Sequence, residues 1–192
     1  MKKSIIAAGA ASVALAAMPI VGVFAADGNE TIKDTIQITI DSACAVTSTN
    51  TENTYAVSMT NSELKSNIGG TVMNVKCNDA TGWQLNAVGT GTGTTVDLLD
   101  AAGSSTDIAS GTATSGATSN WAFKVAGDST VAAYQNFAAV PTVAAKVAEG
   151  SGATDMTSGT NVTATYQVWI SATQQADTYT GSVTYTLVHP KA

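Results

Sequence analysis

The sequence holds few residues that could act as a general base or a nucleophile. Its one histidine, His189, lies beside Pro190 close to the C-terminal end of the sequence. A serine hydrolase needs a histidine held between the nucleophile and a carboxylate, and we expect His189 to be a solvated side chain instead. Neither a Gly-x-Ser-x-Gly nor a His-Glu-x-x-His motif occurs. The sequence therefore predicts a protein that is not an enzyme, with no catalytic residue.

Two cysteines, Cys44 and Cys77, are the other reactive side chains. In an exported chain an even number of cysteines indicates a disulfide. With one histidine and no Cys-x-x-Cys spacing, a metal site lacks ligands. Asp97, Asp100 and Asp107 lie in an oxygen-rich stretch that would permit weak calcium binding, but their spacing matches no calcium-binding loop. We predict a Cys44–Cys77 disulfide, no metal and no cofactor.

The N-terminal segment predicts export. Two lysines precede an apolar run, and Val23 and Ala25 fit the small-residue pattern of a signal-peptidase site. A retained membrane anchor is the alternative, although a proline and a glycine interrupt the run. We predict a signal peptide over residues 1–25 and a single domain over residues 26–192, secreted to the cell surface or cell wall.

The charge of the predicted mature chain limits its partners. After Ala25 the sequence has six lysines, no arginine and fourteen Asp or Glu residues, a net charge of −8. Phosphate backbones are bound by clustered Lys and Arg side chains. We therefore expect no nucleic-acid partner, and no membrane partner once the signal peptide is removed.

Apolar and polar residues alternate in seven segments, and this period of two is typical of half-buried strands. The segments are residues 34–41, 55–59, 71–77, 82–88, 120–125, 161–170 and 178–188. Short strands separated by turn residues predict an all-β protein, an antiparallel immunoglobulin-like β-sandwich. Residues 131–140 fit a short helix or a strand. Residues 89–116 and 149–161 are rich in Gly, Ser and Thr, so we expect long surface loops or a short, weakly paired hairpin.

The tryptophans differ in the face on which the alternation places them. Trp83 and Leu85 share the inward face of their segment, so we expect them to fill the core rather than to hold a ligand. Trp169 falls on the outward face, among polar residues. An exposed Trp in that setting suits glycan stacking or a protein contact. The alternative is that Trp169 lies under one of the long loops.

Two short motifs resemble those of WxL-domain surface proteins of Gram-positive bacteria. The stretch "ATGWQL" is similar to their first Trp-x-Leu motif. The stretch "TYTGSVTYTLVHP" is similar to the second, with Tyr179, Thr184, Leu187 and Pro190 matching and Tyr185 standing in place of the second Trp. The resemblance implies an exported β-rich domain that associates non-covalently with peptidoglycan or with a surface protein. It makes Trp83, Leu85, Tyr179 and Tyr185 candidate binding residues, and Trp169 joins them on its outward placement.

A second resemblance concerns the first half of the chain. The stretch "DTIQITIDSACAVTS" followed by "VMNVKCN" is similar to the start of chaperone–usher pilins and spore-coat-U-like proteins. In pilins the N-terminal extension completes a neighbouring subunit by strand addition. The resemblance implies a fimbrial subunit that self-associates through residues 35–41, with Ile36, Ile38 and Ile40 on the donated face.

The sequence thus predicts an exported, non-enzymatic surface protein with a role in adhesion. The first hypothesis is a WxL-like protein bound to the cell wall. The alternative is a pilin-like subunit that assembles by donor-strand exchange.

Overall fold

The structure is a computed structural model that describes residues 37–48, 55–59, 65–90, 96–103, 106–112, 118–127 and 130–189. Residues 1–41 and 42–192 are separate units, and the strands lie in the second. The predicted signal peptide, Ile36 and Pro190 lie outside the described residues. No helix in the described ranges is long and apolar enough to cross a membrane.

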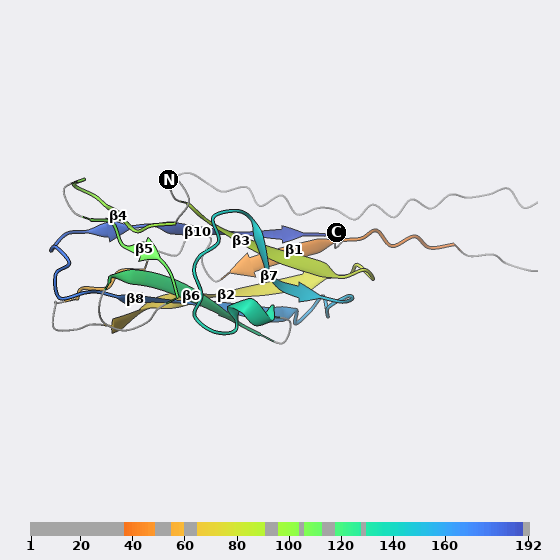
Figure 1. The fold of residues 1–192 in the computed structure, drawn as a ribbon. Coiled ribbons are helices and arrows are strands. Elements are labelled where there is room, and N and C mark those ends of the chain that lie inside the picture. The colour runs from red at the N-terminus through yellow and green to blue at the C-terminus, as the bar shows by residue number, and fades with distance from the viewer. Residues whose placement is uncertain are drawn as a thin grey trace, which may run out of the picture. The chain divides into compact units, whose positions relative to one another are not determined.

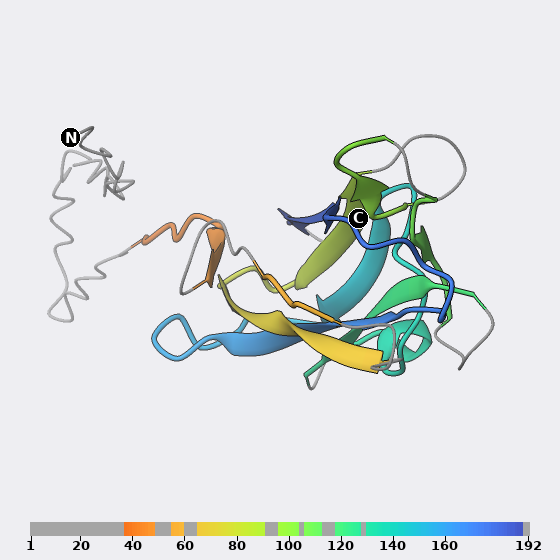
Figure 2. The same cartoon turned by 90° about the vertical axis from the view of Figure 1, so that its left-hand side faces the viewer.

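The second unit is a β-sandwich of two layers (Figures 1 and 2). Sheet A has the strand order β1 (Cys44–Ser48), β2 (Lys65–Cys77), β8 (Thr160–Trp169), β6 (Asn120–Ala126) and β5 (Ala109–Ser110). Sheet B has the order β10 (Ser182–Val188), β3 (Trp83–Thr90) and β7 (Ala145–Gly150). A two-stranded ribbon joins β4 (Leu99–Asp100) and β9 (Tyr179–Thr180), and η1 (Ala132–Tyr134) is a single 3-10 turn. Every pairing is antiparallel except β5 with β6, which confirms the predicted class.

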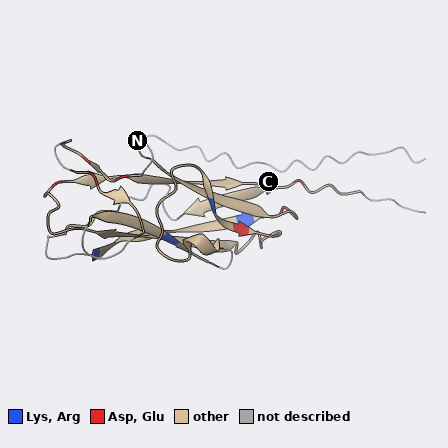
Figure 3. Ribbon diagram, in the orientation of Figure 1, with Lys and Arg blue, Asp and Glu red and all other residues tan. Residues whose placement is uncertain are grey.

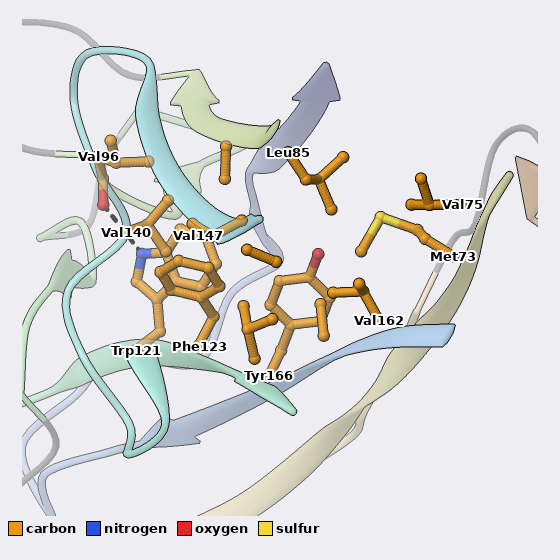
Figure 4. Close-up of a cluster of buried hydrophobic side chains, with 14 of the residues drawn as sticks. Met73, Val75, Leu85, Val96, Trp121, Phe123, Val140, Val147, Val162 and Tyr166 are labelled. Atoms are coloured by element: carbon orange, nitrogen blue, oxygen red, sulfur yellow. Dashed lines mark hydrogen bonds between the residues drawn. The ribbon is translucent and has the colours of Figure 1, made fainter. Parts of the chain in front are cut away.

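The core forms where the alternating strands of the two sheets turn their apolar faces toward each other (Figure 4). Trp83 and Leu85 of β3 and Phe123 of β6 belong to this core, and all three side chains are fully buried. Trp121 is also buried, and its indole N–H donates a hydrogen bond of 3.0 Å to the carbonyl of Val96. That bond offsets the cost of removing the indole N–H from water.

Some strand boundaries differ from the sequence prediction. The described part of the predicted strand 34–41 and all of 55–59 contain no strand, whereas β1 and β7 were not predicted. In β7 a register shift against Leu85 and Asn86 leaves Val147 and Ala148 both buried. A bulge of this kind destroys the period-two signal, so the pattern could not reveal the strand.

The Gly-, Ser- and Thr-rich stretch is more than a surface loop. Leu98 and Ile108 pair through two backbone hydrogen bonds of 2.8 and 3.0 Å, which gives the short hairpin left open by the sequence. Val96 and Ile108 are buried in the core. Residues 131–140 begin with η1 and then pair once, at Ala138, with Phe123 of β6.

The predicted disulfide is present. Cys44 and Cys77 face each other at the end of the β1–β2 ladder and are bonded. Ser42 and Ala43, which precede β1, are therefore held close to the turn between β2 and β3.

Replacing both cysteines by alanine will lower the free energy of unfolding by about 3–4 kcal/mol, because the bond closes a loop in the unfolded chain. The measurement is urea unfolding at pH 7 followed by tryptophan fluorescence. The control is Thr47→Ala, an exposed position of β1, which will change stability by less than about 0.5 kcal/mol. Equal stability of the double variant and the wild type would contradict the expectation.

Candidate functional site on the open side of the sandwich

Each sheet ends in an edge strand, and the two edge strands lie on the same side of the sandwich. Among the described strands, β1 is the last of sheet A and pairs only with β2, and β10 is the last of sheet B and pairs only with β3. β1 and β10 lie near each other, but the described chain has no backbone ladder between them. We call this open side, bordered by β1 and β10, the seam.

The other side of the sandwich is closed by crossing segments. The amide of Val131 donates to the carbonyl of Val147 in β7, and the amide of Gly89 donates to the carbonyl of Pro141. The amide of Ser110 in β5 donates to the carbonyl of Val96. Within the described ranges, the seam is the side on which a strand could be added to both sheets.

The residues of the seam do not protect its edges. Exposed edge strands commonly carry charged residues or proline, which prevent pairing with another chain. β10 has the sequence SVTYTLV and β1 the sequence CAVTS, with neither feature. β7, the other edge of sheet B, contains Lys146 and Glu149 in an ion pair of 3.0 Å. The charges that would prevent strand addition are therefore present at one edge of sheet B and missing from the other.

The inward side chains of the edge strands are incompletely covered. Val46 of β1 and Val183, Tyr185 and Leu187 of β10 pack against the core but are only partly buried. In the neighbouring strand β3, by contrast, the inward Leu85 is fully buried. The seam thus presents partly covered apolar side chains along strand edges that have no second partner strand among the described residues, and an added β-strand would cover them.

Three tyrosines meet inside the seam. The hydroxyl oxygens of Tyr166 in β8 and Tyr185 in β10 lie 3.0 Å apart in a hydrogen bond that joins the two sheets. The ring of Tyr55 lies 5.9 Å from the ring of Tyr166. Burial raises the pKa of Tyr166, and burial also raises the pKa of Tyr185, so both hydroxyls keep their protons at neutral pH.

The residues that lead into β1 are fixed by the turn between β2 and β3. Ser42 donates a hydrogen bond of 2.9 Å from its hydroxyl to the Asp79 carboxylate, and the amide of Ala43 donates to the side-chain carbonyl of Asn78. The Thr81 amide and hydroxyl donate to the other Asp79 oxygen at 2.8 and 2.7 Å. These bonds, led by that of the Thr81 hydroxyl, lower the pKa of Asp79.

Ile38 and Ile40, two of the three candidate donor-strand residues, lie in the first unit. They are 75% and 81% exposed, and residues 37–43 adopt neither helix nor strand. Ile36, the third candidate, lies outside the described residues. Ile38 and Ile40 are two residues apart and largely exposed. A binding partner could bury both side chains.

The Trp-x-Leu motif forms part of the core. Trp83 and Leu85 are both 0% exposed, and Gly150 packs directly on the Trp83 ring. Their inward placement agrees with the sequence prediction, and it leaves no surface of either side chain for a ligand. The buried Trp83 indole N–H has no hydrogen-bond partner among the described residues.

Of the two placements that the sequence left open for Trp169, the covered one is correct and the exposed one is wrong. The alternation places the residue on the outer face of sheet A correctly, but its side chain is only 7% exposed. Phe137 packs edge-on against it at 6.0 Å, and the Lys65 ammonium lies 5.2 Å above its ring. Phe137 belongs to the segment between β6 and β7, and such long-range cover cannot be seen in the alternation of β8. Trp169 does not provide the exposed platform that glycan stacking requires.

Tyr179 and Tyr185, the other candidate binding residues, are partly buried. The Tyr179 hydroxyl donates to the carbonyl of Gln175 at 2.9 Å and accepts from the side-chain amide of Gln174 at 2.7 Å. Tyr179 therefore fixes the loop between β8 and β9, whereas Tyr185 faces the seam.

That loop borders a polar cleft of about 380 Å³. Hydroxyl and amide side chains make up most of its lining, with one carboxylate: Thr106, Asp107, Ala109, Thr118, Ser119, Ser171, Thr173, Gln174 and Gln175. Such groups could bind the hydroxyls of a neutral polar ligand, although none of the described lining residues is aromatic.

Two of the three aspartates considered for calcium accept hydrogen bonds from backbone amides. Asp107 accepts a hydrogen bond from the amide of Asp100, and Asp100 accepts one from the amide of Ala102. Among the described residues no three His, Cys, Asp or Glu side chains gather as a metal site. Charged residues are few and scattered over the chain (Figure 3).

Comparison with protein-family models, with characterised proteins and with solved structures finds no match to this chain.

The seam contains a residue that the sequence did not single out for function. Tyr55 lies in a segment expected to be a strand, and Gly69, where a side chain would meet the Tyr55 ring, is the one sequence signal that a bulky group approaches β2 there.

The lowered pKa of Asp79 predicts an acid-dependent loss of stability. Because its pKa is lower in the folded state than its unfolded value near 3.9, the carboxylate stabilises the fold above about pH 4. This contribution is lost as the pH falls through the folded-state pKa. Asp79→Asn will therefore unfold at lower urea concentration than the wild type at pH 7, and the difference will shrink at pH 3.

Asp155→Asn is the matched control, since Asp155 accepts hydrogen bonds from the amides of Thr157 and Ser158 and its pKa is also lowered. Only Asp79→Asn should speed hydrogen exchange at the Ala43 amide. A difference between Asp79→Asn and the wild type that is the same at pH 3 and pH 7 would contradict this account.

Proposed function

We propose that the protein is an exported structural subunit that assembles by strand addition, with the segment around Ile38 and Ile40 of one copy entering the seam of the next. The observation that supports this most directly is that one chain contains both complementary parts. One is an exposed segment with alternating isoleucines, and the other is an edge strand without charges or proline.

An added strand would pair with the backbone edge of the seam and would also cover its apolar side chains. A strand laid along β10 pairs with its free backbone groups, and its inward side chains cover Val183, Tyr185 and Leu187. Ile38 and Ile40 are two residues apart, so in a strand they point to the same face. Burying each would contribute roughly 1.5–3 kcal/mol before the cost of ordering the segment.

The disulfide supports export, because such bonds persist mainly in oxidising compartments. The bonds from Ser42 and Ala43 to the β2–β3 turn also hold the residues that lead into β1. Tension along an assembled fibre would therefore act on a covalently closed β1–β2 pair.

Replacing Ile38 and Ile40 together by aspartate will abolish assembly, because two carboxylates would have to be buried in an apolar seam. Deleting residues 26–41 will have the same effect. The measurement is unboiled, non-reducing gel electrophoresis, in which the wild type forms a ladder that collapses on heating. The control is Gln37→Asp with Thr39→Asp, which adds the same charge on the opposite face and will leave a ladder. A persistent ladder from the Ile38→Asp, Ile40→Asp variant would overturn the proposal.

Wall association is a second candidate, favoured by the polar cleft. Its hydroxyl and amide groups suit a polyhydroxylated ligand such as the glycan strands of peptidoglycan, which is the partner implied by the WxL resemblance. The buried Trp83 and Leu85 would then support the fold, and the cleft would make the contacts with the wall.

Purified mature protein will be retained by washed cell walls, and Thr118→Val with Gln175→Ala will lower the retained amount about tenfold. That estimate corresponds to the loss of one or two hydrogen bonds. Thr142→Val with Gln135→Ala makes the same chemical change at exposed positions away from the cleft and will bind as the wild type does. Equal retention of both double variants, or no retention of the wild type, would rule the cleft out.

A further inference from the structure

Tyr55 occupies the part of the seam that β1 does not reach. β1 pairs with residues 73–77 of β2, and the rest of β2 has no strand on that edge in the described chain. The Tyr55 ring lies there, against Gly69 of β2 and 5.9 Å from the ring of Tyr166. Because Tyr166 bonds to Tyr185 of β10, the ring stands between the two sheets. In Figure 2 the trace of residues 55–59, in orange, runs beside β2.

The backbone of β2 leaves space for the Tyr55 ring. Its register against β8 shifts between Asn67 and Gly69, and Gly69 has a φ of +136°. A Cβ at Gly69 would lie 2.5 Å from the Tyr55 Cδ1. The next residue, Gly70, accepts a hydrogen bond of 2.6 Å from the Tyr55 hydroxyl. A glycine is required here because the ring takes the space that a side chain would fill.

The attachment of this segment depends on side chains rather than on a backbone ladder. Residues 55–59 form no strand, although Tyr55 and Met59 both pack against the core. Ala56, Val57 and Ser58 between them are exposed. Removing the segment from the seam breaks ring contacts and the tyrosine hydrogen bond, and it disrupts no sheet.

We propose that Tyr55 occupies the seam in the free subunit and that an inward isoleucine of the incoming segment displaces its ring. This inference rests on the proposed function, because it concerns the same seam. A strand on the free edge of β10 directs its inward side chains toward the inner face of sheet A, where the ring lies. A close-packed interior has no room for both. Tyr55 thus covers the core before assembly and slows the entry of the partner strand.

Hydrogen exchange of the mature protein tests the displacement. The probe is a synthetic peptide with the sequence of residues 35–41, TIQITID, added in excess to the full mature chain. We expect slower exchange in residues 182–188, which gain a partner strand, and faster exchange in residues 55–59, which leave the seam. Protection of 182–188 with unchanged or slower exchange in 55–59 would overturn the inference and leave strand addition standing. No change in either segment would overturn both.

Substitutions of Tyr55 provide an independent readout, the association rate of the labelled peptide. Tyr55→Ala will bind it about tenfold faster than the wild type, and Tyr55→Phe, which keeps the ring, will stay within about twofold of the wild type. Tyr134→Ala is the matched control, because the Tyr134 ring packs 5.2 Å from Phe123 rather than in the cluster of Tyr55, Tyr166 and Tyr185. If Tyr134→Ala accelerates binding equally, the fold has loosened in general, and the role of Tyr55 is contradicted. An unchanged association rate for Tyr55→Ala would contradict it as well.

Discussion

The free backbone edge of β10 is the constraint on which the other features of the molecule depend. A strand inside a sheet has hydrogen-bonding partners on both edges, whereas among the described strands β10 pairs with β3 alone. Its inward residues Val183, Tyr185 and Leu187 are half covered for the same reason. An edge of this kind usually carries charges or a bulge, and β10 has no charged residue and no register shift against β3. The sandwich therefore has one closed side and one that is chemically suited to receive a strand.

The remaining structure stabilises the sandwich in spite of this open side. The core on the closed side is built from fully buried residues such as Trp83 and Phe123. On the open side the disulfide at Cys44, the bonds of Asp79 and the Tyr166–Tyr185 hydrogen bond replace the missing strand contacts. Tyr55 adds an aromatic ring where backbone pairing is missing. Apart from the covalent disulfide, each of these is a non-covalent side-chain interaction, which can be displaced without unfolding a sheet.

Much of the fold could be predicted from the sequence because its signal is local. The alternation in β3, β6, β8 and β10 shows directly which side chains point inward. The disulfide could be predicted because the chain has two cysteines and a predicted export signal. The features that escaped prediction depend on contacts between distant segments. The bulge in β7 broke the alternation, and Phe137 covers Trp169 from another part of the chain. The position of Tyr55 depends on a glycine pair of β2, which only the folded chain brings beneath its ring.

Photo-crosslinking from position 38 is the most direct test of the seam as the assembly site. A photoreactive amino acid would replace Ile38 in the mature protein, and mixing isotopically light and heavy copies would separate crosslinks between copies from those within one. The account predicts crosslinks between copies that map to residues 183–187 of β10. Crosslinks confined to one copy, or crosslinks between copies on the outer faces of the sheets, would contradict it.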